Sequence, residues 1–544
     1  MEADQVKSSF TNLSLNDNKN GNHPPHQRID IEQNTHTGSH RMQHKESVLL
    51  RGGNAVDALV AVAICIGAIN GHSSGIGGGH LMVFYNRHHA KCSTIDARET
   101  APISTNSQTY VENPKDAFLG YKSIGVPGEI AGLWKAYKHF GSGNINWQDL
   151  LRPTVDLLNN GYPTSPLMEK SLHARNEQVK HEPSMRKFFT NNNTGELYKE
   201  GEILRNPQLA NTLKELAESK DPAEHFYRGE MAKTIADEMK EKGAYITLED
   251  LKNYQAIIAE PLESYVLAFE NEPLVMCGMG TPSSYPVTQL IVNVMASDAK
   301  FVAGANELIK NMTSTQLRDE IISKIGEKTL PTPEDYDLYK KMNGKTNDHG
   351  TSQITIIDGD GNAVSFTSSI NNVFGAMVRS EKTGIIWNDQ MDDFSIPGSK
   401  NFFGFEPSES NFVAPGKRPM SSMSPLIVYD NNTKNVRLSI GSSGGSKIIS
   451  AVSQVLLQIL LFNSTVKEAI DTPRLHNQFT PFSTQYENGF SETILENLRE
   501  RGQNMTVMDF PLANVHAILR DPNTKILTAN NDYRRAVYTY PTGY

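Results

Sequence analysis

The sequence predicts an α+β protein in which helices and strands occur in runs around one extended core. Two observations predict it: helical apolar periodicity with clear stop signals over residues 129–160, and strand-like segments joined by a turn over residues 353–370. The 544-residue chain is 38% hydrophobic, which is enough to bury a sizeable core. No internal repeat interrupts this pattern.

The first 46 residues form a polar segment rich in Asn, His, Gln and Ser, with Phe10 as its single aromatic residue. Such a segment cannot bury enough apolar surface to offset its ordering entropy, so we expect a disordered tail over residues 1–46. Met1–Lys7 leads into polar sequence, so no signal peptide is expected. The apolar run Ala55–Ile69 is too short for a transmembrane helix and carries Asp57.

Helices dominate the next part of the chain. Residues 55–70 are apolar on all sides, which predicts a buried helix, and after the loop Gly75–Gly79 residues 81–85 predict a strand. Helices at residues 129–140 and 147–160 stop at glycines. Residues 165–345 are expected to be mainly helical, with helices at residues 248–254, 286–295 and 333–342.

A β-hairpin is predicted just after Thr351. Residues 353–358 form the first strand, residues 358–362 (Asp-Gly-Asp-Gly-Asn) give a strong turn signal, and residues 363–370 form the second strand. Further elements are expected beyond it: strands at residues 425–429, 436–440 and 515–519, and helices at residues 448–462 and 491–501.

Charge and cysteine content argue against several partners and cofactors. The net charge is −9 and the pI about 6.0, which leaves no basic surplus for a nucleic acid. The three cysteines, Cys65, Cys92 and Cys277, are odd in number and have no C-x-x-C spacing. Neither a disulfide framework nor a thiolate metal site is therefore expected, and no motif predicts a cofactor.

The segment Asp348-His349-Gly350-Thr351-Ser352 has two interpretations. Thr suits strands and Gly suits turns, so Thr351 could simply begin a hairpin strand. Alternatively, the bond between Gly350 and Thr351 is a self-processing site that yields an N-terminal threonine. The free α-amine of such a residue has a pKa near ~7.7–8.0 and can act as general base for its own hydroxyl.

Two glycine-rich loops resemble nucleotide-binding motifs without matching them. Gly75–Gly79 follows a helix and precedes a strand, the reverse of the Rossmann order. Residues 441–447 (Gly-Ser-Ser-Gly-Gly-Ser-Lys) have Ser446 where a P-loop requires Gly. A Gly-Gly pair between a strand and a helix can aim N–H groups at an oxyanion, so Gly444 and Gly445 form either a tight turn or an oxyanion hole.

Two charged pairs have ordinary local interpretations. Asp392 and Asp393 are expected to form a solvated acidic turn, because no His or Glu stands nearby at a metal-ligand spacing. Arg98 and Glu99 are expected to form a surface ion pair, as such neighbours usually do. No metal site is predicted.

Over roughly residues 47–544 the sequence resembles the γ-glutamyltransferase family. The order and spacing of the matching segments are those of the family, which is more specific than any single motif. These segments are GGNAVDALVAVAICIGAINGHSSGIGGG, DARETAP, GVPGEIAGL, DHGTSQ, AVSFTSSINNVFG, WNDQMDDFS, KRPMSSMSP, GSSGGSK, PRLHNQF and NDYRR.

The resemblance implies a role for each matched site residue. Thr351 would be the nucleophile and new N terminus, Ser369 would hydrogen-bond its hydroxyl, and Gly444 with Gly445 would form the oxyanion hole. The remaining matched residues would bind the γ-glutamyl group: Arg98, Ser421 and Ser422 its α-carboxylate, and Asn371, Gln390 and Asp393 its α-ammonium.

This sequence departs from the family at several positions. Ser369 stands where the family usually has threonine, and Gln353 where it usually has histidine. The family's Ser-Ser-Gly-Gly segment is here Ser283-Ser284-Tyr285-Pro286, and Phe403 lies where some bacterial members have a lid tyrosine.

The resemblance implies the αββα sandwich of the N-terminal-nucleophile hydrolases, cut into an interlocked heterodimer of residues 1–350 (with 47–350 folded) and 351–544. Its substrates would be glutathione and other γ-glutamyl compounds, with water, amino acids or peptides as acceptors. Two alternatives remain open: an acylase for another amide, and a catalytically silent relative that acts as a binding or scaffold protein. Family members are usually at the plasma membrane or extracellular, whereas no anchor or signal is recognised here, so the cellular location stays open.

Overall fold

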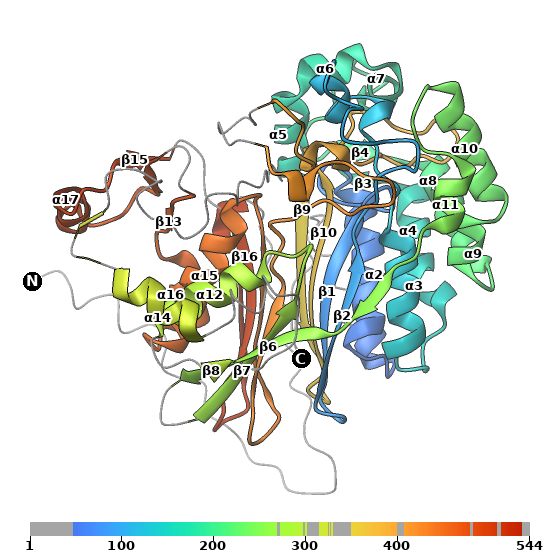
Figure 1. Cartoon of the computed structure of the whole chain (residues 1–544). Coiled ribbons are helices and arrows are strands. Elements are labelled where there is room, and N and C mark those ends of the chain that lie inside the picture. Colours follow the sequence, from blue (N-terminus) through green and yellow to red (C-terminus); the bar gives the residue numbers. More distant parts are fainter. Residues whose placement is uncertain are drawn as a thin grey trace, which may run out of the picture.

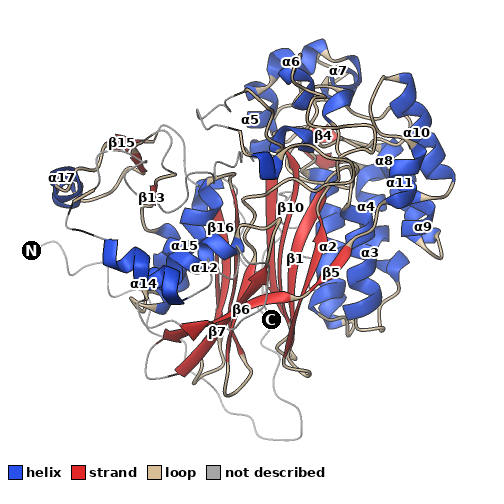
Figure 2. Ribbon diagram, in the orientation of Figure 1, coloured by secondary structure: helices blue, strands red, loops and turns tan. Residues whose placement is uncertain are grey.

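A computed structural model describes residues 47–268, 272–296, 300–301, 315–324, 326, 328–329, 350–399, 407–478, 482–508 and 513–535. The tail of residues 1–46, the helix expected at residues 333–342, and Phe403 lie outside these ranges. Two β-sheets pack face to face, and helices cover their outer faces (Figure 1, Figure 2). This is the expected four-layer αββα arrangement.

The first sheet has the strand order β5-β2-β1-β10-β9, and all neighbours are antiparallel. The predicted hairpin of Thr351 is confirmed at one edge of this sheet. The bounds are β1 (Gly79–Asn86), β2 (Lys91–Ala97), β5 (Ile257–Ala259), β9 (Gly350–Ile357) and β10 (Ala363–Asn371).

The second sheet has the order β17-β16-β12-β11-β7-β6-β8, again antiparallel throughout. Three of its strands agree with the predicted ones to within a few residues. The bounds are β6 (Pro261–Ala268), β7 (Glu272–Met279), β8 (Lys300–Phe301), β11 (Leu426–Asp430), β12 (Val436–Ser443), β16 (Asn514–Arg520) and β17 (Leu527–Asn531).

The expectation that residues 165–345 are mainly helical is wrong for residues 257–268 and 272–279. These residues form β5, β6 and β7, and the β6–β7 pair lies inside the second sheet. Strand propensity depends on the neighbouring strands, and the partner of β7 is β11, about 150 residues later in the chain. The chain passes from the first sheet to the second between β5 and β6.

Helices cover the outer face of the first sheet and extend into a helical region beyond it. As predicted, α2 is buried nearly all round, and α3 and α4 have the predicted bounds. The helices are α2 (Ala55–Ile69), α3 (Glu129–Phe140), α4 (Trp147–Asn160), α5 (Pro166–Ala174), α6 (Asn176–His181), α7 (Pro183–Phe189), α8 (Pro207–Glu218), α9 (Pro222–Tyr227), α10 (Glu230–Glu241) and α11 (Leu248–Asn253). The short strands β3 (Tyr162–Pro163) and β4 (Ile203–Leu204) pair among them.

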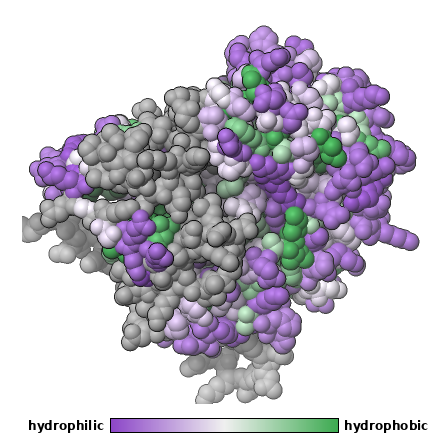
Figure 3. Space-filling model, viewed as in Figure 1, coloured by the Kyte–Doolittle hydropathy of each residue, from purple (hydrophilic) through white to green (hydrophobic). Residues whose placement is uncertain are grey.

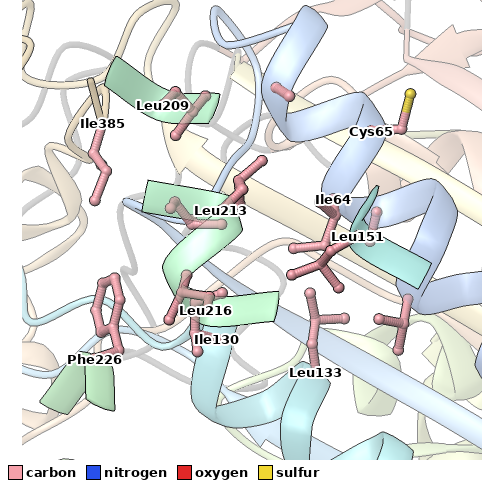
Figure 4. Packing of buried hydrophobic residues seen from close by; sticks show 14 of the residues in the cluster. Ile64, Cys65, Ile130, Leu133, Leu151, Leu209, Leu213, Leu216, Phe226 and Ile385 are labelled. Carbon is pink, nitrogen blue, oxygen red and sulfur yellow. The ribbon is translucent and has the colours of Figure 1, made fainter. Parts of the chain in front are cut away.

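The largest apolar cluster lies where these helices meet. Figure 4 shows Ile64 of α2, Leu133 of α3 and Leu151 of α4 packed together, with Leu213 and Leu216 of α8 beside them. Each of these side chains is at most 2% exposed. Burying a large aliphatic side chain stabilises a fold by about 1.5–3 kcal/mol, so this cluster anchors the helical layer on the first sheet.

The second sheet has its own helical cover, formed by α12, α15 and α16. A small sheet of β13, β14 and β15 lies beside it with α17 (Figure 1). The bounds are α12 (Tyr285–Met295), α14 (Thr315–Lys324), α15 (Lys447–Leu460), α16 (Val466–Asp471), α17 (Glu492–Glu500), β13 (Leu475–His476), β14 (Thr484–Tyr486) and β15 (Met505–Val507).

A disulfide bond joins Cys92 of β2 to Cys277 of β7, whereas Cys65 is buried and takes no part in a disulfide. The expectation of no disulfide is therefore wrong. The two residues are 185 positions apart, and only the packing of one sheet on the other brings them together. Cysteine number and spacing carry no information about such a distant pair.

The described surface in Figure 3 is mainly hydrophilic, with small, separate apolar groups. Among the described residues, no helix has the length and apolar character required to cross a membrane.

Candidate active site

The β9–β10 hairpin brings Thr351 and Ser369 together. They are directly opposite each other in the antiparallel register, and both are buried. The hydroxyl oxygens of Thr351 and Ser369 are 3.2 Å apart. The Ser369 hydroxyl also donates a hydrogen bond to the carbonyl oxygen of Gly350 at 2.9 Å. One side chain therefore contacts both the Thr351 hydroxyl and the Gly350 carbonyl oxygen, on either side of the peptide bond that the sequence predicts to be a self-processing site.

The end of β10 turns sharply immediately after Ser369. The register shifts between Ser369 and Asn371, and Asn371 has φ 72°. Asparagine tolerates this left-handed conformation better than most residues. The backbone N–H of Asn371 donates to the Ser369 hydroxyl at 2.9 Å, which leaves the serine proton for another acceptor. The bulge thus orients Ser369.

The loop Gly75–Gly79 packs tightly against this bulge. A Cβ on Gly78 would lie 2.1 Å from the carbonyl oxygen of Ser369, and one on Gly77 would lie 2.2 Å from that of Ile386. The glycines are therefore required for close backbone approach. Close packing of the backbone therefore explains the glycines of residues 75–79, which do not match a dinucleotide-binding motif.

Gly444 and Gly445 connect β12 to α15 and have φ values of 131° and 66°. A Cβ on Gly444 would lie 2.6 Å from the Cα of Ala513, so a side chain does not fit there. β12 faces β9, because a Cβ on Gly441 would touch the side chain of Gln353 at 2.4 Å. Ser439 of β12 donates to the carbonyl oxygen of Val364, which pairs with Ile356 of β9, so β12 runs toward the start of β9 and the Gly444–Gly445 turn lies at that end of the sandwich.

Arg98 directly follows β2 and is fully buried. The expected ion pair between Arg98 and Glu99 is present, with Arg98 Nη1 3.9 Å from Glu99 Oε2. The expectation that it lies at the surface is wrong, because both side chains are at most 1% exposed. Arg98 Nη2 forms an ion pair with Asp393 and donates to the carbonyl oxygen of Met420 at 3.0 Å. Tertiary contacts from two distant loops thus enclose this guanidinium.

Gln390 and Asp393 belong to the short 3-10 helix η4 (Gln390–Asp393). The expectation of a solvated acidic turn is wrong, because Asp392 and Asp393 are only 6% and 1% exposed. Gln390 Nε2 donates to Asp393 Oδ2 at 2.6 Å. Asn371 Nδ2 donates to the carbonyl oxygen of Asp389 at 3.1 Å, which brings the end of β10 next to η4.

Ser421 and Ser422 follow Met420, whose carbonyl oxygen binds Arg98. Ser284 donates to the carbonyl oxygen of Ser421 at 2.6 Å, and the Ser421 N–H donates to the carbonyl oxygen of Pro282 at 2.9 Å. The loop after β7 therefore supports this serine pair. In the sequence, Ser284 stands out only as part of a segment that departs from a family motif, and no local pattern predicts this support.

Several polar atoms around Arg98 are buried without a hydrogen-bond partner in the described part of the chain. They are Arg98 Nη1, Asn371 Oδ1, Gln390 Oε1 and Ser422 Oγ. An unsatisfied buried polar group is costly, so such a cluster is typical of a site that completes its hydrogen bonds with a ligand. The predicted substrate-binding residues are thus joined by contacts into one polar region.

A family model for γ-glutamyltranspeptidase matches residues 43–303 and 295–541. The chain belongs to the γ-glutamyltranspeptidase family. It is 35% identical over 522 residues to scoloptoxin SSD14 of Scolopendra dehaani, covering 90% of this chain and 89% of that protein. It is 33% identical over 522 residues to glutathione hydrolase proenzyme 1 of Schizosaccharomyces pombe, covering 88% and 79%.

The fold of this γ-glutamyltranspeptidase family member also resembles that of a cephalosporin acylase from Bacillus halodurans. The TM-score is 0.76, with coverage of 95% of this chain and 97% of that chain. Sequence identity is 22%, so this likeness concerns the fold alone.

Two buried carboxyl groups lie next to the predicted γ-glutamyltranspeptidase site residues. Burial raises the pKa of Glu99 to about 8, although the adjacent Arg98 opposes this shift. Burial and the nearby Asp392 raise the pKa of Asp389 well above its usual range. The burial and the raised pKa of these two carboxyl groups were not predicted, because no local sequence pattern distinguishes a buried carboxyl group from an exposed one.

Gln353 stands where the family usually has histidine, and its side chain forms hydrogen bonds within the hairpin. Its Oε1 accepts from Thr367 Oγ1 at 2.6 Å, and its Nε2 donates to Ser365 Oγ at 3.2 Å. Both partners are on β10, so the Gln353 side chain links the two strands of the hairpin. It is two residues from Thr351, and its side chain also lies against Gly441 of β12.

Proposed function

We propose that this family member is a glutathione hydrolase and γ-glutamyltransferase that cleaves its own chain between Gly350 and Thr351. The observation that carries the proposal is the position of the Ser369 hydroxyl, which contacts both the Gly350 carbonyl oxygen and the Thr351 hydroxyl. The name of the S. pombe relative, a glutathione hydrolase proenzyme, supports the same activity.

Self-cleavage would proceed by attack of the Thr351 hydroxyl oxygen on the carbonyl carbon of Gly350. The hydrogen bond from Ser369 withdraws electron density from the carbonyl oxygen and stabilises the negative charge that develops there. Breaking the C–N bond moves the acyl group from nitrogen to oxygen. Water then hydrolyses the resulting ester, which leaves a carboxylate on Gly350 and a free α-amine on Thr351.

The free α-amine would be the general base in each later turnover. Its ordinary pKa of about 7.7–8.0 lies close to neutral pH, so it can accept the proton of the Thr351 hydroxyl. Ser369 would keep that hydroxyl oriented toward the substrate. This arrangement requires no cofactor or metal ion.

The polar region around Arg98 suits the zwitterionic end of a γ-glutamyl group. Arg98 and Asp393 form an ion pair with each other. An α-carboxylate at Arg98 and an α-ammonium at Asp393 would replace one internal ion pair by two pairs with the substrate. A guanidinium binds a carboxylate bidentately, and Arg98 Nη1 has no hydrogen-bond partner among the described residues.

Holding both charged groups would aim the γ-carbonyl group at Thr351. Positioning of this kind supplies a large part of enzymatic rate enhancement. Attack by Thr351 would give an oxyanion stabilised by the N–H groups of the Gly444–Gly445 turn, and then a γ-glutamyl ester. Water or the amine of an amino acid or peptide would take up the γ-glutamyl group and release the threonine.

The proposed subunits, residues 1–350 and 351–544, would remain interlocked after cleavage. Each sheet contains strands from both sides of residue 350, with β1 paired to β10 and β7 paired to β11. Separation would break both ladders and expose the apolar layer between the sheets. A heterodimer from one precursor is therefore the expected mature form.

Intact mass combined with N-terminal sequencing of purified protein tests this proposal directly. We expect two chains of roughly 38.8 and roughly 21.5 kDa from the 60.3-kDa precursor, the smaller beginning Thr351-Ser352-Gln353. The mature protein should hydrolyse a γ-glutamyl anilide. A single stable chain without this activity would instead favour a silent binding protein, and activity restricted to other amides would favour an acylase.

A further inference from the structure

The Cys92–Cys277 disulfide joins the two layers of the sandwich. Cys92 lies near the start of β2 in the first sheet, and Cys277 lies in β7 of the second. Their exposed fractions are 3% and 0%, and both belong to the apolar cluster between the sheets. The bond therefore sets the spacing of the layers at this point rather than bracing a surface loop.

The same two strands lead to opposite sides of the proposed carboxylate site. Arg98 directly follows the last residue of β2. Residues 280–284 follow β7, and within them Ser284 and Pro282 hold the backbone of Ser421 through hydrogen bonds of 2.6 and 2.9 Å. A change in the spacing of β2 and β7 would thus move Arg98 relative to Ser421.

The proposed cleavage would increase the importance of this bond. The chain crosses from the first sheet to the second between β5 and β6, and returns between β8 and β9. Cleavage before Thr351 would cut the second of these connections. Of the links between described strands, the larger chain would then keep the β5–β6 crossing and the disulfide.

We propose that the Cys92–Cys277 disulfide holds Arg98 and Ser421, on the two sides of the carboxylate site, at a fixed distance from each other after cleavage. Its loss would weaken donor binding without stopping self-cleavage, because Gly350, Thr351 and Ser369 lie on the directly paired strands β9 and β10. That the donor is a γ-glutamyl compound rests on the proposed function. The presence of the disulfide does not depend on that function.

Formation of the bond transfers two electrons from the two thiols to a small disulfide such as oxidised glutathione. The two protein sulfurs become joined, the oxidant is reduced to two thiols, and the two protons of the protein thiols pass to them. Exchange requires a thiolate to reach a sulfur atom, and both sulfurs are buried. The bond is therefore expected to form while the chain folds and to resist reduction afterwards.

Substitution of each disulfide cysteine, with substitution of Cys65 as control, tests this role. We expect Cys92→Ala, Cys277→Ala and the double variant to raise the KM for a γ-glutamyl anilide by the same factor, about three- to tenfold, because each removes one shared bond. Their rates of self-cleavage should stay within about twofold of wild type. Cys65→Ala should keep the wild-type KM. Wild-type chain refolded with oxidised or with reduced glutathione gives the same comparison without any substitution.

Two further measurements separate this idea from its rivals. Wild-type protein unfolded without reductant should show one titratable thiol, that of Cys65, and the three variants should melt roughly 3–8 °C lower. Unchanged KM and melting temperature in all three variants would overturn the proposal. Three titratable thiols with one bound zinc ion would also overturn it, since Glu263 lies with both sulfurs in a cluster of possible metal ligands. If no γ-glutamyl donor is hydrolysed at all, the proposed function fails, and the thiol number and melting temperatures still decide the cross-link.

Discussion

The hydroxyl of Ser369 donates a hydrogen bond of 2.9 Å to the carbonyl oxygen of Gly350, which belongs to the peptide bond proposed to be cut. The two residues are 19 positions apart and meet only because β9 and β10 pair in one register. The family usually has threonine at this position, and a serine hydroxyl provides the same donor with one methyl group less.

Removal of this donor should slow maturation. We expect Ser369→Ala to reduce the rate of self-cleavage by about 10- to 100-fold, because a hydrogen bond to a developing negative charge contributes about 1.5–3 kcal/mol. Ser369→Thr keeps the hydroxyl and should mature at close to the wild-type rate. The rate is measured from the loss of full-length chain on denaturing gels. Equal rates for wild type and Ser369→Ala would mean that this hydroxyl is idle.

Thr351 should be indispensable for both cleavage and turnover. Thr351→Ala removes the attacking oxygen, so we expect a single uncut chain without γ-glutamyl anilide hydrolysis. Thr351→Ser keeps the hydroxyl and should still be cut. Intact mass distinguishes these forms, and normal cutting of the alanine variant would refute the assignment of the nucleophile.

Arg98 should govern donor affinity. Truncation to alanine would leave Asp393 buried without its ion-pair partner, which costs stability as well as binding. Arg98→Lys keeps the positive charge but loses bidentate geometry, so we expect a KM about tenfold or more above wild type with little change in self-cleavage. Steady-state kinetics together with a melting curve separate the two effects. A wild-type KM in Arg98→Lys would place the carboxylate site elsewhere.

The Gly444–Gly445 turn should be intolerant of side chains. Gly444→Ala would add a Cβ 2.6 Å from Ala513 in a left-handed backbone conformation. We expect kcat to fall at least about 100-fold, because the oxyanion donors would shift. Gly143 also has positive φ, at 77°, with open space around it, so Gly143→Ala is a matched control for backbone strain. Equal kcat values for the two variants would argue against an oxyanion role.

Glu99 should make stability depend on pH. Its folded pKa of about 8 is above its ordinary value, so the unfolded chain loses this proton first as pH rises. The contribution of Glu99 to stability is therefore fully present below about pH 4.5 and is lost progressively up to about pH 8, by up to about 5 kcal/mol.

Glu99→Gln should flatten this pH dependence. The comparison is best made by denaturant unfolding of the uncut Thr351→Ala chain between about pH 5 and 8.5, with and without the second substitution. The raised pKa of Asp389 acts in the same direction in both chains and cancels in the difference. Parallel curves for the two chains would show that Glu99 is ionised in the folded protein.

Much of the fold was predictable where local pattern and packing agree. α3 and α4 have the predicted bounds because their apolar period and their glycine stops are local properties of the chain. The β9–β10 hairpin was predictable for the same reason, since its turn residues and both strands lie within about 20 positions. The resemblance to a family then pointed to residues of the site that no local pattern distinguishes.

By itself, the sequence predicted many of the helices and the β9–β10 hairpin, and the family resemblance assigned expected roles to Thr351 and its matched partners. Only the tertiary structure decided that Arg98 is buried against Asp393, 295 positions away, and that Cys92 meets Cys277 across two sheets. Secondary structure follows from interactions over a few residues. Burial, ion pairs and cross-links follow from how the layers pack, and that packing depends on the whole chain at once.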